Sequence, residues 1–437
     1  MLRKKAEAKI KTNFWVMPAL YGAGAFVLAV LSVLLEQVLS DYEGVKGMIP
    51  SFLFVDKELA QTILSAISTS LLTMTTITFS SVLVVLTTFL AQFSPRTLQN
   101  FINDSKTQLV LGTFIGGYVY SLLLLSQIKG REVENTFILP ALAIVVAFIC
   151  LAMFVFLIHH VTDWIKVGNV VSSITTETLD SIKKHNQEQH PGREAAKEAQ
   201  ELKAEEAFGI KSSKRGYIEY ADIEAMVRMA SEQDIVVRFE KSLGNYVDVD
   251  TPLLKVWNSR ENFDESRLLN LMMISSRQEV IQGVEFGIQK LVEVALRGIA
   301  PGKNDPETAI NCIEHLSQIL IKIGKNYEPN PYYCDSEGKV RVIIEKPQFA
   351  DFLYDSFYQI RHYGKADVSV MASILEALTL VAETNVENIK ESVWDFSGYI
   401  VEGIQQQEWL QLDKRHLNQK LSRMAAACGR PAGEIAI

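Results

Sequence analysis

Four long apolar segments in the first third of the chain restrict its fold more than any other feature. They run from about Phe14 to Val38, Leu59 to Phe93, Gln108 to Ile128 and Phe137 to Ile158. A helix needs roughly 20 apolar residues to cross a bilayer core about 30 Å thick, and each segment meets that requirement. The sequence therefore predicts a four-helix transmembrane domain over residues 14–164.

Lysine and arginine near the segment ends predict the orientation of these helices. The N-terminal tail, the loop after the second segment and the region after the fourth carry ten of these residues, and the two opposite loops carry four. Positive loops stay on the cytoplasmic side. We therefore expect a multi-pass protein of the bacterial inner membrane with both termini in the cytoplasm.

The remainder of the chain has the composition of a water-soluble protein. Over the whole sequence 48% of residues are hydrophobic and 22% are charged, but the charges concentrate after Lys166. We expect a basic tail (1–13), the membrane domain (14–164), a linker or stalk (165–215), a small β-rich unit (216–257) and a helical cytoplasmic domain (258–437). The predicted fold class is mainly α, with four transmembrane helices followed by a cytoplasmic α+β domain.

The second apolar segment is unusual in its length and its hydroxyl groups. Its 35 residues contain no charge, and a helix of that length extends about 52 Å, which exceeds a bilayer core. At 100° per residue six hydroxyl side chains fall within an arc of about 80°. This hydroxyl stripe consists of Ser65, Thr69, Thr73, Thr76, Ser80 and Thr87.

Two interpretations of the hydroxyl stripe remain open at this point. Several copies of the helix around an axis would form a translocation path lined by uncharged hydroxyls. Alternatively, serine and threonine allow close helix packing and hydrogen bond to other helices or to their own carbonyls. No acidic or basic residue lies within the segment, so a proton relay or a charged selectivity ring is not expected there.

Glycines suggest two further features. Gly112, Gly116 and Gly117 in the third segment form a small-residue face, which is typical of tight helix packing. Later, Gly302, Asn304 and Asp305 precede Pro306 at the start of a predicted helix. Capping explains these residues, and the alternative function is an anion or partner carboxylate bound at the helix N-terminus.

Enzymatic, metal and nucleic-acid functions receive no support from the sequence. The four cysteines are scattered without zinc spacing, and no P-loop, dinucleotide fingerprint or nucleophile elbow occurs. His159 and His160 are adjacent and point to different helix faces, so they are expected to anchor the membrane surface rather than hold a metal. The net charge of −8 argues against binding to nucleic acid. We expect neither a cofactor nor catalysis.

Several stretches resemble a known family. They are ThrPheSerSerValLeuValValLeu (78–86), GlnPheSerProArg (92–96), the glycine-rich 107–120 and AlaLeuArgGlyIleAlaProGlyLysAsnAspProGluThrAla (295–309). The chain resembles the bacterial domain-of-unknown-function family 2254 of predicted membrane proteins. The resemblance implies a membrane architecture and an inner-membrane location, and it implies no particular activity.

The sequence favours an oligomeric channel or transport protein for ions, with the second helix lining the path and the cytoplasmic domain assembling or gating it. The alternative is a membrane-anchored sensor or scaffold, in which the helices hold a cytoplasmic domain that binds a ligand or partner. The expected partners are the lipid bilayer, further copies of the chain and ions.

Overall fold

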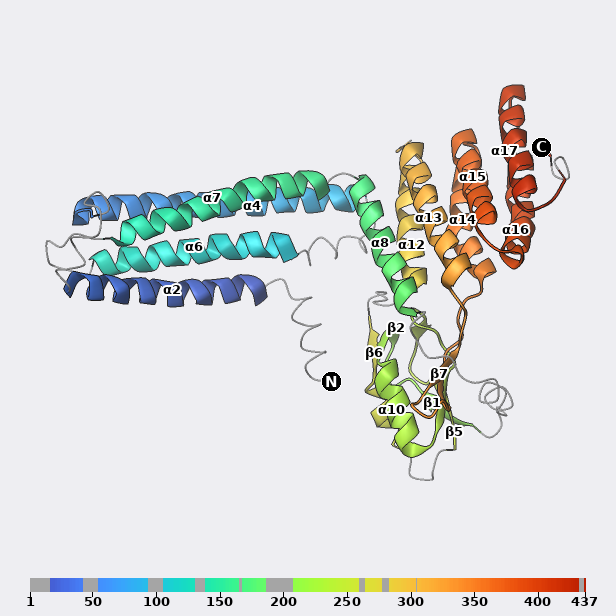
Figure 1. Cartoon of the computed structure of the whole chain (residues 1–437), viewed down its shortest axis with the longest axis horizontal. Helices are drawn as coiled ribbons and strands as arrows, with labels where there is room; N and C mark the ends of the chain where they lie inside the picture. The colour runs from blue at the N-terminus through green and yellow to red at the C-terminus, as the bar shows by residue number, and fades with distance from the viewer. Residues whose placement is uncertain are drawn as a thin grey trace. The chain divides into compact units, whose positions relative to one another are not determined.

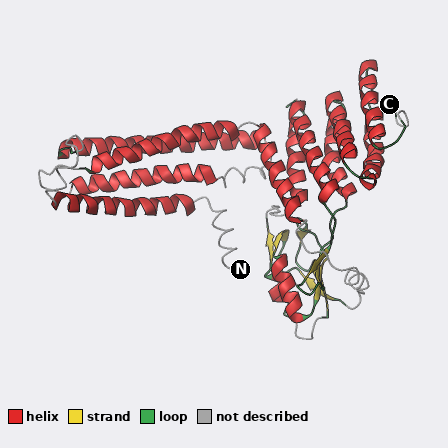
Figure 2. Ribbon diagram, viewed as in Figure 1, coloured by secondary structure: helices red, strands yellow, loops and turns green. Residues whose placement is uncertain are grey.

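The computed structural model divides the chain into two compact units, Met1–Asn169 and Val170–Ile437. It describes residues 16–41, 54–92, 105–129, 138–164, 167–185, 207–258, 264–276, 283–303, 305–431 and 436–437. All described strands belong to the second unit (Figure 2). The basic tail (1–13) lies outside the described residues.

The described part of the first unit, called the membrane unit below, contains four long helices that lie side by side (Figure 1). Each contains a stretch that is long and apolar enough to cross a membrane, as the sequence predicted. The third helix packs against the other three. The helices are α2 (Val16–Asp41), α4 (Lys57–Gln92), α6 (Ser105–Lys129) and α7 (Leu139–Trp164).

Helix α8 (Val167–His185) begins three residues after α7 ends and packs within the second unit. Its buried side chains, which include Val171, Ile174 and Ile182, recur at helical spacing. The Thr175 hydroxyl lies 2.9 Å from Nδ1 of His315. The predicted linker (165–215) thus contains a helix with its own packing face, and its residues 186–206 lie outside the described part.

The second unit contains two sheets and two short helices, which together form the β unit. The larger sheet has the strand order β1-β5-β3-β8-β7 and the smaller has β4-β2-β6. All strand pairs are antiparallel except β3 and β8, which are parallel. The helices are α10 (Ile223–Gln233) and α11 (Glu265–Leu269), and the strands are β1 (Phe208–Lys211), β2 (Gly216–Ala221), β3 (Val236–Phe239), β4 (Tyr246–Val247), β5 (Pro252–Trp257), β6 (Met272–Ser275), β7 (Tyr332–Cys334) and β8 (Val340–Ile343).

The predicted limits of this unit, 216–257, are too narrow. Strand β1 precedes them, β6 follows them, and the β7–β8 hairpin comes from the middle of the region predicted to be helical. Val342 and Ile344 join the apolar core beneath α10. The hairpin therefore completes a sheet that the earlier strands begin, and Figure 1 shows its orange strands among the green ones.

Besides α8, the described part of the second unit contains six further helices, which form the helical stack. One layer contains α13, α15 and α17, and the other contains α12, α14 and α16, with neighbours in each layer in contact. The helices are α12 (Val284–Gly298), α13 (Pro306–Asn326), α14 (Phe349–Gly364), α15 (Val368–Thr384), α16 (Glu387–Gln405) and α17 (Gln411–Ala427).

Helix α8 approaches the helical stack very closely at one glycine. A Cβ atom added to Gly287 of α12 would lie 1.8 Å from the hydroxyl oxygen of Thr178 on α8. Any residue type other than glycine would place its Cβ atom in this contact, so Gly287 fixes where α8 packs within the second unit.

Candidate functional site: the outer face of helix α4

Helix α4 turns its hydroxyl stripe away from the other helices of the membrane unit. All six residues of the stripe, Ser65 to Thr87, are exposed. Leu64, Leu71 and Val82 on the remaining side are buried, where α6 and α7 pack against α4. Packing within one chain therefore does not account for the stripe. The exposed arc is called the outer face of α4 below.

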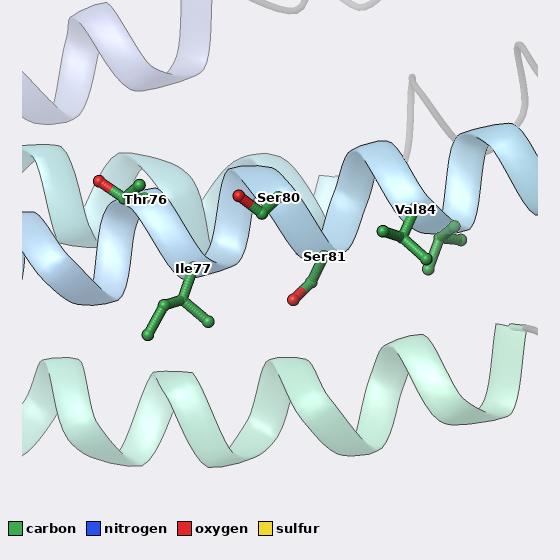
Figure 3. A pocket seen from close by; sticks show the side chains of 6 residues that line it. Thr76, Ile77, Ser80, Ser81 and Val84 are labelled. Carbon is green, nitrogen blue, oxygen red and sulfur yellow. The ribbon is translucent and has the colours of Figure 1, made fainter.

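A shallow, open groove of about 400 Å³ extends from the outer face to the buried Val85. Figure 3 shows Thr76 and Ser80 on one edge of α4, and Ile77 and Ser81 on the other. The groove is lined by Thr76, Ile77, Ser80, Ser81, Val84 and Val85, all from α4 itself. One copy of the helix thus provides one wall.

Threonines of the outer face donate their hydroxyl hydrogens to their own helix. Thr73 bonds the carbonyl of Thr69 at 2.9 Å, Thr76 that of Leu72 at 3.0 Å, and Thr87 that of Val84 at 2.8 Å. A hydroxyl has one hydrogen and two acceptor lone pairs. With the hydrogen used, each of these oxygens presents only acceptor capacity to whatever covers the outer face.

Thr62 belongs to the same face, although the sequence analysis left it out. It is exposed, and its hydroxyl donates to the carbonyl of Glu58 at 2.9 Å. Its helical direction lies about 20° from that of Thr73. The periodicity that revealed the stripe therefore also identifies Thr62.

Aliphatic side chains share the outer face with the hydroxyls. Leu72, Ile77, Leu83 and Val84 are all exposed, with Val84 at 63%. The charged residues of α4 are Lys57 and Glu58, in its first turn. The face is therefore mixed and uncharged over most of its length.

The three glycines of α6 lie where neighbouring helices approach. A Cβ atom at Gly112 would lie 2.8 Å from the Tyr21 ring, and one at Gly116 would lie 3.3 Å from the Tyr21 carbonyl oxygen, both on α2. A Cβ at Gly117 would lie 2.8 Å from the Cys150 sulfur on α7 and 3.3 Å from Leu71 on α4. Gly112 and Gly116 thus face one neighbour, and Gly117 faces two others.

Replacing Gly117 by alanine will destabilise the membrane unit by about 1–3 kcal/mol, the usual cost of overpacking. The added methyl group collides with the Cys150 sulfur, so Cys150→Ala in the same chain will restore most of the loss. Thermal unfolding in detergent micelles measures both variants. If Gly117→Ala melts as the parent does, the close approach of α6 to α7 is wrong.

Two polar contacts inside the membrane unit escaped the sequence analysis. The hydroxyls of Ser32 and Tyr120 lie 3.0 Å apart in the buried contact between α2 and α6. Glu36, which is also buried, accepts hydrogen bonds from the backbone N–H of Ile138 at 3.0 Å and of Leu139 at 3.3 Å. A carboxylate stabilises the N-terminus of a helix, so Glu36 of α2 caps α7.

The Gly302 turn is accounted for by helix capping. Asp305 caps α13 by accepting from the backbone N–H and the hydroxyl of Thr308, at 3.3 and 2.7 Å. Gly302 has a positive φ of 89°, which glycine adopts readily. The Asp305 carboxylate occupies the position that a bound anion would take. Asn304 lies outside the described residues.

An ion-pair network ties the β7–β8 hairpin to α10. The Asp335 carboxylate accepts from Nε of Arg341 at 2.6 Å, from the Ser231 hydroxyl at 3.1 Å, and from two backbone N–H groups of its own turn. Arg341 also donates to Asp234 at 2.9 Å. Asp335 and Arg341 are buried. Every polar atom named here has a partner, so the network stabilises the fold.

Metal-binding and redox chemistry have no visible centre in the described part of the chain. It contains no group of three His, Cys, Asp or Glu side chains that converge. The four cysteines are free, and burial raises the pKa of the Cys312 thiol, which keeps it protonated and unreactive. The His160 ring stacks on Phe156 with ring centroids 5.8 Å apart.

Comparison with known proteins agrees with this architecture. A family model described as "Predicted membrane protein (DUF2254)" matches residues 11–379. Uncharacterized proteins of Mycobacterium bovis and Mycobacterium tuberculosis are each 25% identical to the chain over 342 residues, which is 75% of this chain and 64% of theirs. The chain thus spans less than two thirds of the length of these relatives, and no solved structure matches it. Because the family model covers most of the sequence, the chain belongs to the family of predicted membrane proteins known as domain-of-unknown-function family 2254.

Proposed function

We propose that this membrane protein is one subunit of a homo-oligomeric channel or transport protein for ions, and that α4 lines the path. The observation that carries the proposal is the exposure of the whole hydroxyl stripe, Ser65 to Thr87, on the side of α4 away from α6 and α7. Hydroxyls on a membrane helix gain most where they meet water or another polar surface.

Several copies are required because one α4 forms only one wall of the groove. Copies related by rotation about an axis along the membrane normal would bring their outer faces together and enclose a path. The exposed aliphatic residues beside the stripe, such as Leu72 and Val84, suit the contacts between neighbouring copies. The helical stack and β unit then assemble or gate the ring.

Cations are the favoured ions. The hydroxyls of Thr62, Thr73, Thr76 and Thr87 donate to backbone carbonyls, so their oxygens face outward as acceptors. Oxygen acceptors replace the hydration shell of a cation, whereas an anion requires donors. Beyond Glu58 no charged side chain of α4 opposes either ion.

The orientation and the non-enzymatic role belong to the same proposal. Ten Lys and Arg residues near one set of helix ends, against four near the other, favour a bacterial inner-membrane location with both termini in the cytoplasm. The second unit then operates in the cytoplasm, where free cysteines remain reduced.

Removal of the acceptor oxygens tests the proposal directly. Purified protein in liposomes will conduct K⁺ or Na⁺, and Thr73→Val with Thr76→Val will lower the flux roughly thirtyfold, since the two lost interactions together are worth about 2 kcal/mol. Valine preserves the shape of threonine. Thr113→Val on α6 is the matched control, because its hydroxyl bonds its own helix in the same way. Absence of flux for several cations and anions would reject the channel.

A sensor or scaffold is the second candidate, and the mixed character of the outer face favours it. Leu83 and Val84 are strongly exposed beside the stripe, and lipid or a packed neighbour suits them as well. Cysteines placed at Thr69, Thr76 and Ser80 in a chain without native cysteines separate the two functions. A path labels with water-soluble reagents at all three positions, whereas lipid or packed helices protect them.

A further inference from the structure

The last helix of the helical stack carries a polar groove that the proposed function does not use. The groove has a volume of about 570 Å³ and lies along one side of α17. It is lined by Arg415, Asn418, Gln419, Ser422 and Arg423. A charged groove on stacked helix pairs is a common surface for binding other chains.

Two residues from the end of the chain lie against this side of α17. The N–H of Ile437 donates to Oδ1 of Asn418 at 2.9 Å, and Nδ2 of Asn418 donates to the Ile437 carbonyl at 3.3 Å. Gln405 donates to the Ala436 carbonyl at 3.0 Å. Neither Ala436 nor Ile437 lies in a helix or a strand. Their main-chain groups are thus held by two amide side chains of the stack.

These hydrogen bonds involve main-chain atoms of the bound segment and none of its side chains. The amide group of Asn418 has both a donor, Nδ2, and an acceptor, Oδ1. Both bond to the main chain of Ile437. Any segment with free backbone N–H and C=O groups offers the same partners. The site is therefore suited to extended polypeptide in general.

Charge adds a preference to this main-chain recognition. Arg415 and Arg423 lie two turns apart with Asn418 between them, and both are exposed. Neither forms an ion pair with another residue that the structure describes. Guanidinium groups pair strongly with carboxylates, so a segment that continues along the groove gains from aspartate or glutamate.

We propose that the α17 groove binds an extended acidic segment of a partner protein, and that Ala436 and Ile437 occupy part of this site in its absence. The described residues of the chain's own segment, Ala436 and Ile437, make the main-chain contacts and carry no acidic side chain. A partner that supplies carboxylates displaces it. This inference does not depend on ion transport.

Peptide binding to the full membrane protein in detergent micelles, lacking only residues 432–437, tests the proposal. The probes are fluorescent peptides with the sequence of residues 430–437, extended at the N-terminal end by three aspartates or three lysines. The aspartate peptide will bind at least about tenfold more tightly than the lysine peptide. The intact chain will bind it more weakly, because its own segment competes at high effective concentration.

Variants separate the two parts of the site. Asn418→Ala will weaken both peptides about tenfold by removing two hydrogen bonds, and Arg415→Glu with Arg423→Glu will reverse the preference. Arg228→Glu, an exposed charge reversal on α10, is the control and will change neither. Melting temperatures establish that each variant is folded. If the double glutamate variant does not fold, Arg415→Gln with Arg423→Gln is used in its place. No binding, equal affinities for the two peptides, or no effect of Asn418→Ala overturns the proposal.

Discussion

Replacing Arg341 by methionine will destabilise the β unit by about 3–5 kcal/mol, the usual cost of leaving one partner of a buried ion pair alone. The Asp335 side chain is only 4% exposed, and its carboxylate lies 2.6 Å from Nε of Arg341. Methionine fills the space but provides no donor. The carboxylate retains the Ser231 hydroxyl and two backbone N–H groups, which do not neutralise it.

Hydrogen exchange of the intact protein measures this loss where it occurs. Amides of β3, β7 and β8 will lose roughly two to three powers of ten in protection, since 1.4 kcal/mol corresponds to tenfold. The double variant Arg341→Met with Asp335→Asn will recover most of it, because asparagine still accepts from the turn and carries no charge. Unchanged protection in the single variant would show that the pair does not hold the hairpin.

The same pair predicts a pH dependence with a definite sign. Burial alone raises the pKa of Asp335, but the hydrogen bonds from Arg341, Lys339, Glu337 and Ser231 outweigh it and hold the pKa below its ordinary value. A carboxylate with a lowered folded pKa contributes stability that is complete above the unfolded pKa, near 3.9, and is lost as the pH falls through the folded pKa. The melting temperature of the parent will therefore fall more steeply below about pH 4 than that of the double variant.

Local sequence patterns predict the membrane unit well because its constraints are local. A bilayer requires long apolar helices, so composition alone locates α4 within two residues at each end. Periodicity also groups the six residues of the hydroxyl stripe. It does not reveal which way the stripe faces, because that depends on whether Leu64 and Leu71 or the hydroxyls meet α6 and α7.

The β7–β8 hairpin shows where local patterns fail. Its strands have three and four residues, and β8 pairs with β3, in which Val237 lies opposite Val342. Three helices, α11, α12 and α13, lie between these partners in the sequence. Asp335 and Gly338 are typical turn residues, but the sheet that their turn completes depends on contacts distant in the chain. The same holds for Glu36, whose partners, Ile138 and Leu139, lie at the start of α7.

Placing a positive charge at position 76 will lower cation flux at least about tenfold, and this is the sharpest test of the proposed path. In a chain without native cysteines, Thr76→Cys is reconstituted first and then modified with a positively or a negatively charged methanethiosulfonate reagent. Modification after assembly avoids the cost of inserting a charged helix into the membrane. At 4 Å a unit charge acts on an ion by about 1–4 kcal/mol, and every copy around the axis adds its own.

The positive adduct is therefore expected to lower cation flux by at least about tenfold, whereas the negative adduct, although of similar size, will lower it far less. Phe148→Cys on α7 is the control, because that side chain is also highly exposed, at 67%, but lies on another helix of the membrane unit. Equal inhibition by both reagents would indicate simple obstruction. A charge within the path acts on every ion that passes it. If position 76 is modified and a measured flux does not change, the water that reaches α4 lies outside the path.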